Sequence, residues 1–493
     1  MVNKIVLEDT VILYWGRAKE FVEGCKYCIS YGRKAVYTKK THYTIEGLEN
    51  EKSLKIMVSM VNADNKVLKE YESETVYLPS AKRKLDVTKP PYNAVGDGKT
   101  LNTSALQHAL DDCTPNQIVY IPQGTFLTGA LNMHSDTELY LAENAILQGT
   151  DDPNDYLPKI KSRFEGVECL CYRSLINMGE LDRYGGYNCK NVIIRGKGAV
   201  LGGGRALMEN IVKNETGREF LNDVDIDQTE REARRTRGRL INISNTQNVV
   251  IYGIEAGMSP AWNIHMIYSD NVVTAGCYIH SEEVNNGDGW DPDSSTNCTI
   301  FNCDFKTRDD MIAIKSGKNP EGNAINRPSR NIRVFDCRCT MGHGLAIGSE
   351  MSGGVENVQV WDCQMEDSRC GFEIKGAKER GGYVKDVSVH NSAFSILAIR
   401  SVRYNCDGAS AEQPPVFEDY HFENITLTGV CRKHTGETWD EAVIITEGFD
   451  EKGYELKNVT LKNIKIKRRE HNPKHVMQIA CVAGIKLENI VCE

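Results

Sequence analysis

Short runs that alternate apolar and polar residues recur along most of the chain, at intervals of roughly 20–30 residues. Most copies begin with Asn followed by Val or Ile, as at 191–194, 248–251, 331–334, 357–360, 424–427, 458–461 and 489–491. Repeated short strands without intervening helices are what a parallel β-helix requires, because each coil buries its inward face on its neighbours. A β-propeller also contains short strands, but its four-stranded blades repeat over longer units. The pattern therefore predicts a parallel β-helix, a solenoid of the all-β class.

The repeat region opens with one helical segment. Residues 103–110 are apolar at helical spacing, and Thr103 or Ser104 at their start could serve as the N-cap. Residues 119–126 then form the first expected strand of the repeats. A helix at this place would cover the open end of the solenoid, where strand edges would otherwise be unpaired.

The first 85 or so residues follow a different pattern. Runs of β-branched and aromatic residues are spaced like the strands of a β-sandwich, at 11–15, 27–31, 42–45 and 53–58. This segment resembles a fibronectin type III module. Lys82-Arg83-Lys84 and Lys89-Pro90-Pro91 then indicate a linker. We therefore expect a small β-sandwich at 1–85, followed by a β-helix domain at 86–493.

One stretch interrupts the repeats. Residues 205–239 are rich in charge and prone to form helix. The segment could be a solvated surface insertion. It could also form a wall of a binding cleft, because long insertions in a solenoid gather on its binding face.

The composition narrows the range of partners. The 493 residues have an ordinary 40% of hydrophobic and 26% of charged residues, and a net charge of −9. That charge argues against nucleic acid as a partner. An anionic ligand remains possible, because local charge decides binding and the best site candidates include Lys315, Lys318, His343, Lys375 and Arg403.

The N-terminal sequence and the cysteines bear on the compartment. The first nine residues contain no apolar run of secretory length, and no segment approaches the roughly 20 apolar residues that span a bilayer. The 17 cysteines are odd in number and scattered along the chain. Reduced thiols fit this pattern better than a disulfide framework, so we expect a cytoplasmic location.

The residues that indicate chemistry are three carboxylates in two short segments. Asp288 lies in Asn286-Gly287-Asp288, and the adjacent pair Asp309-Asp310 follows 21 and 22 positions later. In a β-helix, positions one coil apart stack, so the three side chains would lie together. Hydrolysis of a glycosidic bond needs one carboxylic acid to protonate the leaving oxygen and one carboxylate to activate water. Crowded like charges can supply both, because they raise one pKa while another group stays ionised.

Two further motifs complete a family resemblance. Gly342-His343-Gly344 and then Glu373-Ile374-Lys375 follow the carboxylates. This order and spacing resemble glycoside hydrolase family 28, the polygalacturonase family, over roughly residues 86–493. The signature of that family is Asn-Thr-Asp, Asp-Asp, Gly-His-Gly and Arg-Ile-Lys. The resemblance implies a right-handed parallel β-helix that hydrolyses α-galacturonosidic bonds of pectic oligosaccharides without a cofactor.

The resemblance also implies roles for the catalytic residues. Asp309 would be the general acid, and Asp288 with Asp310 would hold the attacking water in a single-displacement, inverting reaction. His343 would fix the protonation of the acid and contact substrate. Exo action with release of galacturonate is expected, because a cytoplasmic enzyme would meet short oligomers, and because the N-terminal module and the insertion could close one end of the cleft.

Further residues are expected to bind the sugar. Lys315 alternates along a strand beside the Asp pair and could reach the cleft, as could Asn286, which precedes Asp288. Tyr404 resembles a family tyrosine beside the leaving side, where an aromatic face suits a sugar ring. Trp262 and His265 lie in a segment that resembles one leading to the family's cleft, but core packing explains them equally well.

The chain departs from the family signature at one position. Glu373 stands where the family has an arginine that helps to hold the galacturonate carboxylate, and a glutamate there would repel that group. Arg369, Lys378 or Arg380 could compensate from nearby. Otherwise the leaving-side sugar would be neutral, such as rhamnose, and the substrate would be a rhamnogalacturonan oligosaccharide.

Two further alternatives remain open on the residues alone. A pectate-lyase-like enzyme would use the same fold with calcium held by carboxylates and a basic proton abstractor. A non-catalytic carbohydrate-binding β-helix would keep the aromatic contacts but has no need of three clustered aspartates. The pairs Cys25/Cys28 and Cys337/Cys339 lack the further nearby ligands of a zinc site, so no metal is expected. A homo-oligomer is possible, and no membrane partner is expected.

Overall fold

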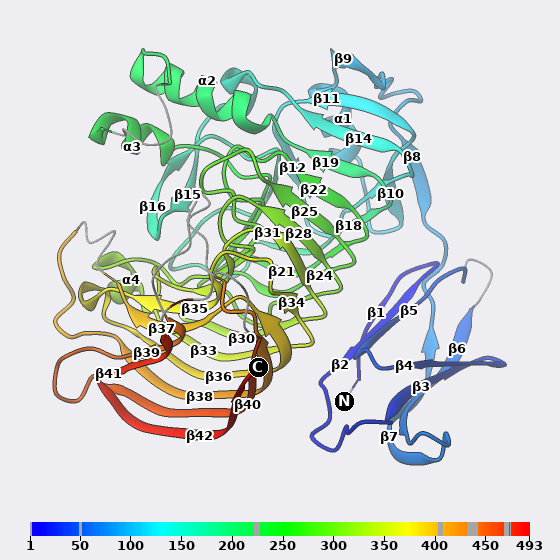
Figure 1. Cartoon of the computed structure of the whole chain (residues 1–493). Coiled ribbons are helices and arrows are strands. Elements are labelled where there is room, and N and C mark those ends of the chain that lie inside the picture. The colour runs from blue at the N-terminus through cyan, green and yellow to red at the C-terminus, as the bar shows by residue number, and fades with distance from the viewer. Residues whose placement is uncertain are drawn as a thin grey trace. The chain divides into compact units, whose positions relative to one another are not determined.

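The structure is a computed structural model that describes residues 2–48, 52–220, 227–402, 408–430, 442–467, 473 and 475–493 (Figure 1). The chain divides into two compact units, Met1–Lys84 and Leu85–Glu493. This division falls within one residue of the boundary expected from the sequence. Among the described residues, no helix is long and apolar enough to cross a membrane.

The N-terminal unit is built from two antiparallel sheets. One has the strand order β1-β2-β5 and the other β4-β3-β6-β7. Its strands are β1 (Val2–Val6), β2 (Val11–Trp15), β3 (Lys26–Tyr31), β4 (Lys34–Thr38), β5 (His42–Ile45), β6 (Ser53–Val61) and β7 (Val67–Tyr77). Alternate residues of both sheets form one buried core, in which the rings of Trp15 and Tyr27 meet edge to face at 5.2 Å. The expected sandwich is thus present, and its likeness to fibronectin type III stays a prediction.

The second unit is a right-handed parallel β-helix, as predicted. One wall is an 11-stranded parallel sheet to which each coil gives one strand. Its members are β12 (Leu131–Met133), β17 (Ile176–Met178), β20 (Ile241–Ser244), β23 (Ile264–Ile267), β26 (Trp290–Asp293), β29 (Ile312–Ile314), β32 (Gly344–Ile347), β35 (Gly371–Gly376), β37 (Leu397–Ser401), β39 (Ala442–Glu447) and β41 (His475–Ala480).

A 22-stranded sheet forms the rest of the solenoid wall. Its first strands are β8 (Arg83–Asp86), β9 (Asp97–Leu101), β10 (Gln117–Ile121), β11 (Gly124–Thr128), β13 (Glu138–Leu141), β14 (Ala145–Gly149), β18 (Cys189–Gly196), β19 (Ala199–Leu201), β21 (Thr246–Tyr252), β22 (Glu255–Gly257) and β24 (Asp270–Ala275). The others are β25 (Tyr278–Ser281), β27 (Thr299–Phe301), β28 (Asp304–Thr307), β30 (Ser329–Phe335), β31 (Arg338–Met341), β33 (Val355–Trp361), β34 (Gln364–Met365), β36 (Tyr383–Phe394), β38 (Val416–Leu427), β40 (Leu456–Ile466) and β42 (Val482–Cys492).

The repeated asparagines explain why the coils stack in register. Asn248, Asn297 and Asn331 have φ values of 60°, 54° and 58°, a left-handed conformation that Asn tolerates better than most residues. Each amide also bonds the equivalent one in the next coil, as from Asn331 to Asn297 at 2.9 Å and from Asn271 to Asn248 at 2.8 Å. The Asn-Val steps of the sequence are therefore turns whose side chains form a hydrogen-bonded ladder.

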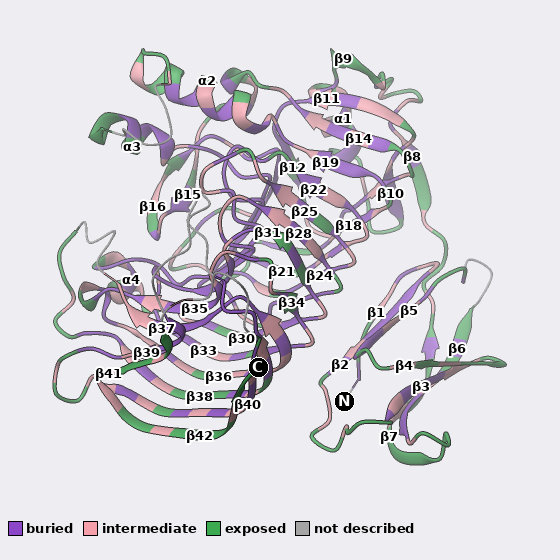
Figure 2. Cartoon of the chain, in the orientation of Figure 1, coloured by how far each residue is buried: buried purple, intermediate pink, exposed green. Residues whose placement is uncertain are grey.

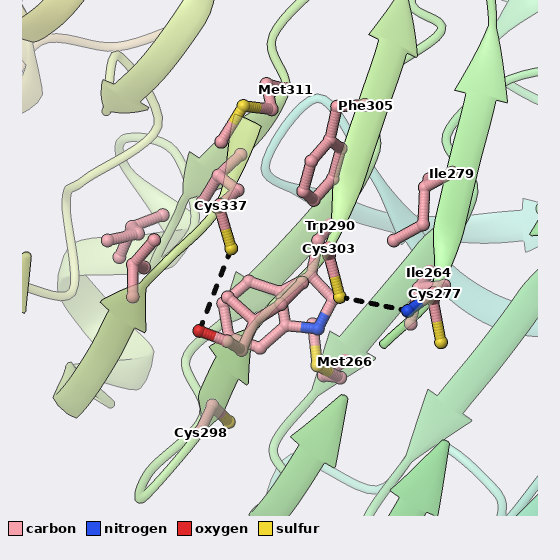
Figure 3. Packing of buried hydrophobic residues seen from close by; sticks show 14 of the residues in the cluster. Ile264, Met266, Cys277, Ile279, Trp290, Cys298, Cys303, Phe305, Met311 and Cys337 are labelled. Carbon is pink, nitrogen blue, oxygen red and sulfur yellow. Dashed lines mark hydrogen bonds between the residues drawn. The ribbon is translucent and has the colours of Figure 1, made fainter. Parts of the chain in front are cut away.

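The solenoid interior is apolar and includes several cysteines (Figure 3). Cys277, Cys303 and Cys337 are fully or almost fully buried. The Cys277 amide donates to the Cys303 sulfur at 3.4 Å, in the same apolar cluster as Trp290 (Figure 3). Every cysteine among the described residues is a free thiol. These cysteines act as small core side chains.

The two ends of the solenoid differ. The predicted helix is α1 (Thr103–Asp111), and its buried Leu106 and Leu110 cover the first coil. Its N-cap is Asn102 rather than the expected Thr or Ser, because Thr103 lies inside the helix and its hydroxyl accepts the Gly129 amide at 2.7 Å. At the other end, β42 is largely exposed, as the green last coil of Figure 2 shows.

The charged segment 205–239 contains α2 (Gly204–Thr216) and α3 (Gln228–Arg234). It lies against a hairpin formed by β15 (Ile160–Phe164) and β16 (Val167–Cys171). Arg235 Nε donates to Glu165 Oε2 at 2.8 Å, and the Tyr172 amide donates to the Thr236 carbonyl at 2.7 Å. Three short helical segments complete the unit, namely η1 (Pro153–Tyr156), α4 (Glu321–Ile325) and η2 (Lys378–Arg380).

Candidate active site

The predicted catalytic residues come together on the 11-stranded sheet. Asp288 precedes β26, Asp309 and Asp310 precede β29, His343 directly precedes β32, and Lys375 lies in β35. These four strands are neighbours and pair in parallel. Residues one coil apart therefore stack, as the sequence spacing predicted.

Backbone hydrogen bonds hold the segments before the strands in place. The Gly289 amide donates to the Asp310 carbonyl at 3.0 Å, and the His343 amide donates to the Asp309 carbonyl at 2.9 Å. The carboxylates and the imidazole are thus fixed by the coil-to-coil ladder. Such rigid support keeps reacting groups in one geometry.

Asp309 and Asp310 share one histidine. The Nδ1 of His343 lies 2.8 Å from Asp309 Oδ1 and 3.4 Å from Asp310 Oδ1. Burial opposes the charge of His343, but the facing carboxylates outweigh it and raise the pKa of His343 well above its usual range. Burial would likewise raise the pKa of Asp309, but His343 outweighs it and lowers this pKa. Without substrate, the shared proton therefore lies on His343 and Asp309 is ionised.

We expect His343 to remain protonated well above the pH at which an ordinary histidine loses its proton. The reason is the ion pair with Asp309, whose stabilisation is lost only when the pH rises through the raised pKa of the folded state. Histidine-selective NMR of a pH titration would measure it, with His343→Gln to assign the signal. In Asp309→Asn the titration should move to lower pH. A wild-type midpoint near about 6.5 would contradict this protonation state.

The glycines that flank His343 are required by the neighbouring coils. A Cβ at Gly344 would lie 2.0 Å from the Gly371 carbonyl oxygen, and one at Gly342 would lie 2.3 Å from the Thr307 hydroxyl. Both glycines also have positive φ values, of 112° and 149°. Their small size lets His343 reach the carboxylates, and the close packing of the coils leaves no room for a larger residue.

Asp288 is held by a buried lysine. Lys315 Nζ donates to Asp288 Oδ2 at 2.8 Å and to Asp291 Oδ2 at 3.3 Å. Burial raises the pKa of both carboxyls, that of Asp291 to about 7. Burial opposes the charge of Lys315, but its acidic neighbours outweigh this effect and raise its pKa. Lys315 was expected to contact substrate; it is buried and instead positions Asp288.

Trp262 and His265 lie beneath this part of the site. The Trp262 ring stacks on Phe164 of the hairpin at 4.8 Å, and His265 Nε2 lies 3.3 Å from Asp293 Oδ2. Burial lowers the pKa of His265 to about 3, so the ring is neutral at ordinary pH. Both side chains are buried, so neither offers a sugar-binding face in this structure. The sequence could not show this, because the hairpin that covers them is distant along the chain.

Arg237 is a site residue that sequence reasoning missed. It is fully buried, and its Nη2 donates to Asn286 Oδ1 at 2.8 Å. Its Nη1 donates to the carbonyls of Asn285 and Pro260, each at 3.0 Å. Asn286, expected to bind sugar, is thus held by the charged segment. Of the two readings of that segment, the contacts favour a wall of the cleft.

The negative charge of Glu373 is balanced by two cations, which the sequence did not indicate. Its Oε1 accepts the Nε of Arg400 at 2.7 Å, and its Oε2 lies 3.4 Å from Lys375 Nζ. Lys375 Nζ also lies 3.4 Å from Asp310 Oδ2. Burial would raise the pKa of Glu373, but Lys375 and Arg400 outweigh it and lower this pKa, so Glu373 is ionised between two cations.

None of the three basic residues proposed as substitutes contacts Glu373. Arg369 donates to the Arg308 carbonyl, Lys378 pairs with Glu451 at 2.6 Å, and the buried Arg380 donates to the Ser349 carbonyl at 2.8 Å. These three residues are near Glu373 in sequence, whereas the cation that pairs with it, Arg400, comes from the next coil. Tyr404 and Arg403, the other expected site residues, lie outside the described residues.

The same groups also satisfy the spacing of a cation site. Asp309, Asp310 and His343 offer ligand atoms within 4.8 Å of one another, the one such group found among the described residues. The short contact between His343 Nδ1 and Asp309 Oδ1 is that of a proton-bridged ion pair. The arrangement is therefore explained by a shared proton.

Comparison with known proteins shows which family matches this chain. A family model described as "Glycosyl hydrolases family 28" matches residues 119–483, which include every described site residue. A "Probable polygalacturonase" of Vitis vinifera is 32% identical over 319 residues, which are 62% of this chain and 60% of that protein. An "Exo-poly-alpha-D-galacturonosidase" of Dickeya chrysanthemi is 27% identical over 78% of this chain and 68% of that protein.

Two solved structures have a similar fold. The family 28 exopolygalacturonase of Yersinia enterocolitica superposes with a TM-score of 0.76 at 22% identity, covering 99% of this chain and 98% of that one. A hyperthermoactive exopolygalacturonase of Thermotoga maritima has a TM-score of 0.66 at 26% identity, covering 82% and 92%. The first likeness spans both units of the chain and supports the fold alone.

Proposed function

Because the chain belongs to glycosyl hydrolases family 28, we propose that it hydrolyses α-galacturonosidic bonds in pectic oligosaccharides and releases galacturonate from a chain end. The observation that carries the proposal is the cluster of Asp288, Asp309 and Asp310 with His343 on adjacent coils. The relatives named for exo action on galacturonides support the substrate class. A purely carbohydrate-binding role would need no such cluster.

In the proposed reaction Asp309 acts as the general acid. His343 Nδ1 lies 2.8 Å from Asp309 Oδ1, so the proton on this nitrogen can pass to Asp309 as charge develops on the leaving oxygen. Asp309 then protonates that oxygen while the glycosidic C–O bond breaks. This relay reconciles the ionised resting state of Asp309 with its acid role.

The attacking water is placed between Asp288 and Asp310. Burial raises the pKa of Asp288, which makes this carboxyl a better proton acceptor than an ordinary aspartate. Water forms the new bond to the anomeric carbon and gives its proton to Asp288. A direct attack of this kind inverts the anomeric centre and forms no covalent sugar–enzyme intermediate.

Exo action is supported by closure of the sheet beside Asp288. Arg163 of the hairpin bonds Asp293 of β26 at 2.7 Å, and Phe164 stacks on Trp262. Arg237 bonds Asn286 from the charged segment. These contacts hold the hairpin and the charged segment against the coils of β23 and β26, beside Asp288, and we infer that they close this end of the binding site so that substrate extends toward β32, β35 and β37. A cleft closed at one end accepts a chain end rather than a chain interior.

The product profile tests this function. Trigalacturonate should yield monogalacturonate from the first time point, detected by mass-resolved chromatography, and polygalacturonate viscosity should fall slowly relative to the release of reducing ends. The matched substrate is a rhamnogalacturonan oligosaccharide with a terminal galacturonate. Unsaturated products that absorb in the near ultraviolet would indicate a lyase. Early mixed oligomers would indicate endo action.

We also propose that the protein works in a reducing compartment, the expected cytoplasm. The support is that the described cysteines are free and that many of them fill the core. Such thiols gain nothing from an oxidising environment. Fractionation of the cells that make the protein would decide this, and its recovery outside them would contradict the proposal.

A further inference from the structure

We propose that Arg400 binds the carboxylate of the sugar on the leaving side and that Glu373 positions it for this task. The inference rests on the proposed hydrolysis of galacturonides and specifies its substrate. It stands against the alternative in which Glu373 marks a neutral leaving-side sugar.

Arg400 lies on the same face of the 11-stranded sheet as Lys375. In the parallel pairing of β35 with β37, Arg400 lies in register with Lys375. Side chains in register on neighbouring parallel strands point to the same face. Lys375 Nζ lies 3.4 Å from the catalytic Asp310, so Arg400 stands one coil further along the same face. One coil is about 4.8 Å, close to the length of one sugar ring.

The position of the hairpin indicates on which side of the catalytic carboxylates the leaving part of the substrate lies. The hairpin and the charged segment contact the coils of β23 and β26, as where Phe164 stacks on Trp262 and Arg163 bonds Asp293. The tip of the hairpin reaches no further than the segment after β29 in the contacts described, where the Lys318 amide donates to the Gly166 carbonyl at 2.9 Å. Arg400 lies on the opposite side of the catalytic carboxylates, where the sheet continues through β37 and β39. If the closed end holds the terminal galacturonate, the rest of the oligosaccharide is the leaving group and must lie over Lys375 and Arg400.

The two cations are more exposed to solvent than the acid between them. The side chains of Lys375 and Arg400 are 12% and 14% exposed, whereas that of Glu373 is 7% exposed. The cations thus reach the surface and the acid lies between and below them. A ligand approaching this part of the cleft meets two positive groups, although the sequence places an acid at the family's arginine position.

Glu373 holds the two cations side by side. Two cations on one face would repel each other, and Glu373 contacts both, at 2.7 Å to Arg400 Nε and 3.4 Å to Lys375 Nζ. Its in-register neighbours are Ala346 and Ala398, whose small side chains leave room for Arg400 to fold toward it. Arg400 Nη2 also lies 2.5 Å from Glu373 Oε1, so one edge of the guanidinium is held by Glu373. The further N–H donors of Arg400 would bind the substrate carboxylate, for which an arginine is better suited than a lysine. Glu373 is therefore a positioning residue, and Arg400 is the recognition residue.

Steady-state kinetics on two substrates test the assignment. For Arg400→Gln we expect the KM for trigalacturonate to rise about 10- to 100-fold with little change in kcat, the size of a lost charge-assisted contact. Hydrolysis of galacturonosyl-rhamnose, whose leaving sugar has no carboxylate, should be slow in the wild type and unchanged in the variant. Arg400→Lys keeps the charge but not the fork, so its KM should be intermediate. Glu373→Gln should raise KM less than Arg400→Gln.

The control and the contrary outcomes are distinct. Lys378→Gln removes an equal charge from an exposed neighbour paired with Glu451, and its kinetics should match the wild type. An unchanged trigalacturonate KM in Arg400→Gln would overturn the assignment while leaving the function intact. So would a wild type that prefers galacturonosyl-rhamnose. A wild type inactive on both substrates would overturn the proposed function itself. If Arg400→Gln unfolds at a lower temperature than the wild type, the KM of Arg400→Lys for trigalacturonate decides the test instead.

Discussion

Replacing Asp309 with Asn should abolish nearly all turnover of trigalacturonate and leave the fold intact. The amide cannot deliver the proton to the leaving oxygen, and loss of a general acid typically costs about 10²- to 10⁴-fold in rate. Asp309 is partly exposed and its backbone bonds to His343 are unaffected by the change, so the coil should keep its structure. Product release per unit time, beside a thermal melt of each variant, would measure the effect.

The matched control is Asp304→Asn. Asp304 lies on β28 and pairs with Arg338 at 2.6 Å on the exposed side of the solenoid, so its activity should equal that of the wild type. Asp310→Asn should also lose turnover but still bind trigalacturonate. More than a few per cent of activity in Asp309→Asn would remove it from the acid role, and Asp288 would then be the next acid to test.

Replacing Lys315 with Met should destabilise the protein most strongly at neutral pH. The change leaves Asp288 and Asp291 buried without their shared cation, and breaking a buried charge cluster typically costs about 3–5 kcal/mol. Burial already raises the pKa of both carboxyls, that of Asp291 to about 7. Without Lys315 these pKa values should rise further, because the cation is what opposes burial.

The pH dependence separates this cause from a simple loss of packing. A folded-state pKa above the unfolded value means that the native protein binds protons which the unfolded chain has released, so stability falls as the pH rises between about 4 and 7. The free energy of unfolding of Lys315→Met, from denaturant titration, should therefore recover toward that of the wild type in acid. Lys306→Met, which removes an exposed lysine paired with Glu282, should show no such trend. An equal deficit at every pH would refute the charge argument.

Much of the fold was predictable because the β-helix repeats its local chemistry. The Asn-Val steps predicted turns, and the structure explains them by left-handed asparagines bonded into a ladder, as at Asn297 and Asn331. The helix before the first coil and the boundary near residue 85 were predicted for similar local reasons. The N-cap was missed at Asn102, since helix ends are decided by backbone contacts that a short motif does not specify.

The candidate site was predicted only in part. The positions of Asp288, Asp309, Asp310 and His343 followed from intervals of about one or more coils, but their partners did not. Lys315 was expected in the cleft and is buried on Asp288, while Trp262 and His265 are covered by a hairpin more than 90 residues away in sequence. Tyr404 stays a prediction, because it lies outside the described residues.

By itself, the sequence determined the solenoid, the family and the order of the catalytic carboxylates, because a regular coil converts a spacing in the chain into a neighbour in space. Only the tertiary structure decided which charges pair and which side chains are buried. Arg400 reaches Glu373 across a coil, and Arg237 reaches Asn286 from an insertion. The physical reason is that burial and charge act through space, so a residue's pKa and its role depend on neighbours that no local motif contains.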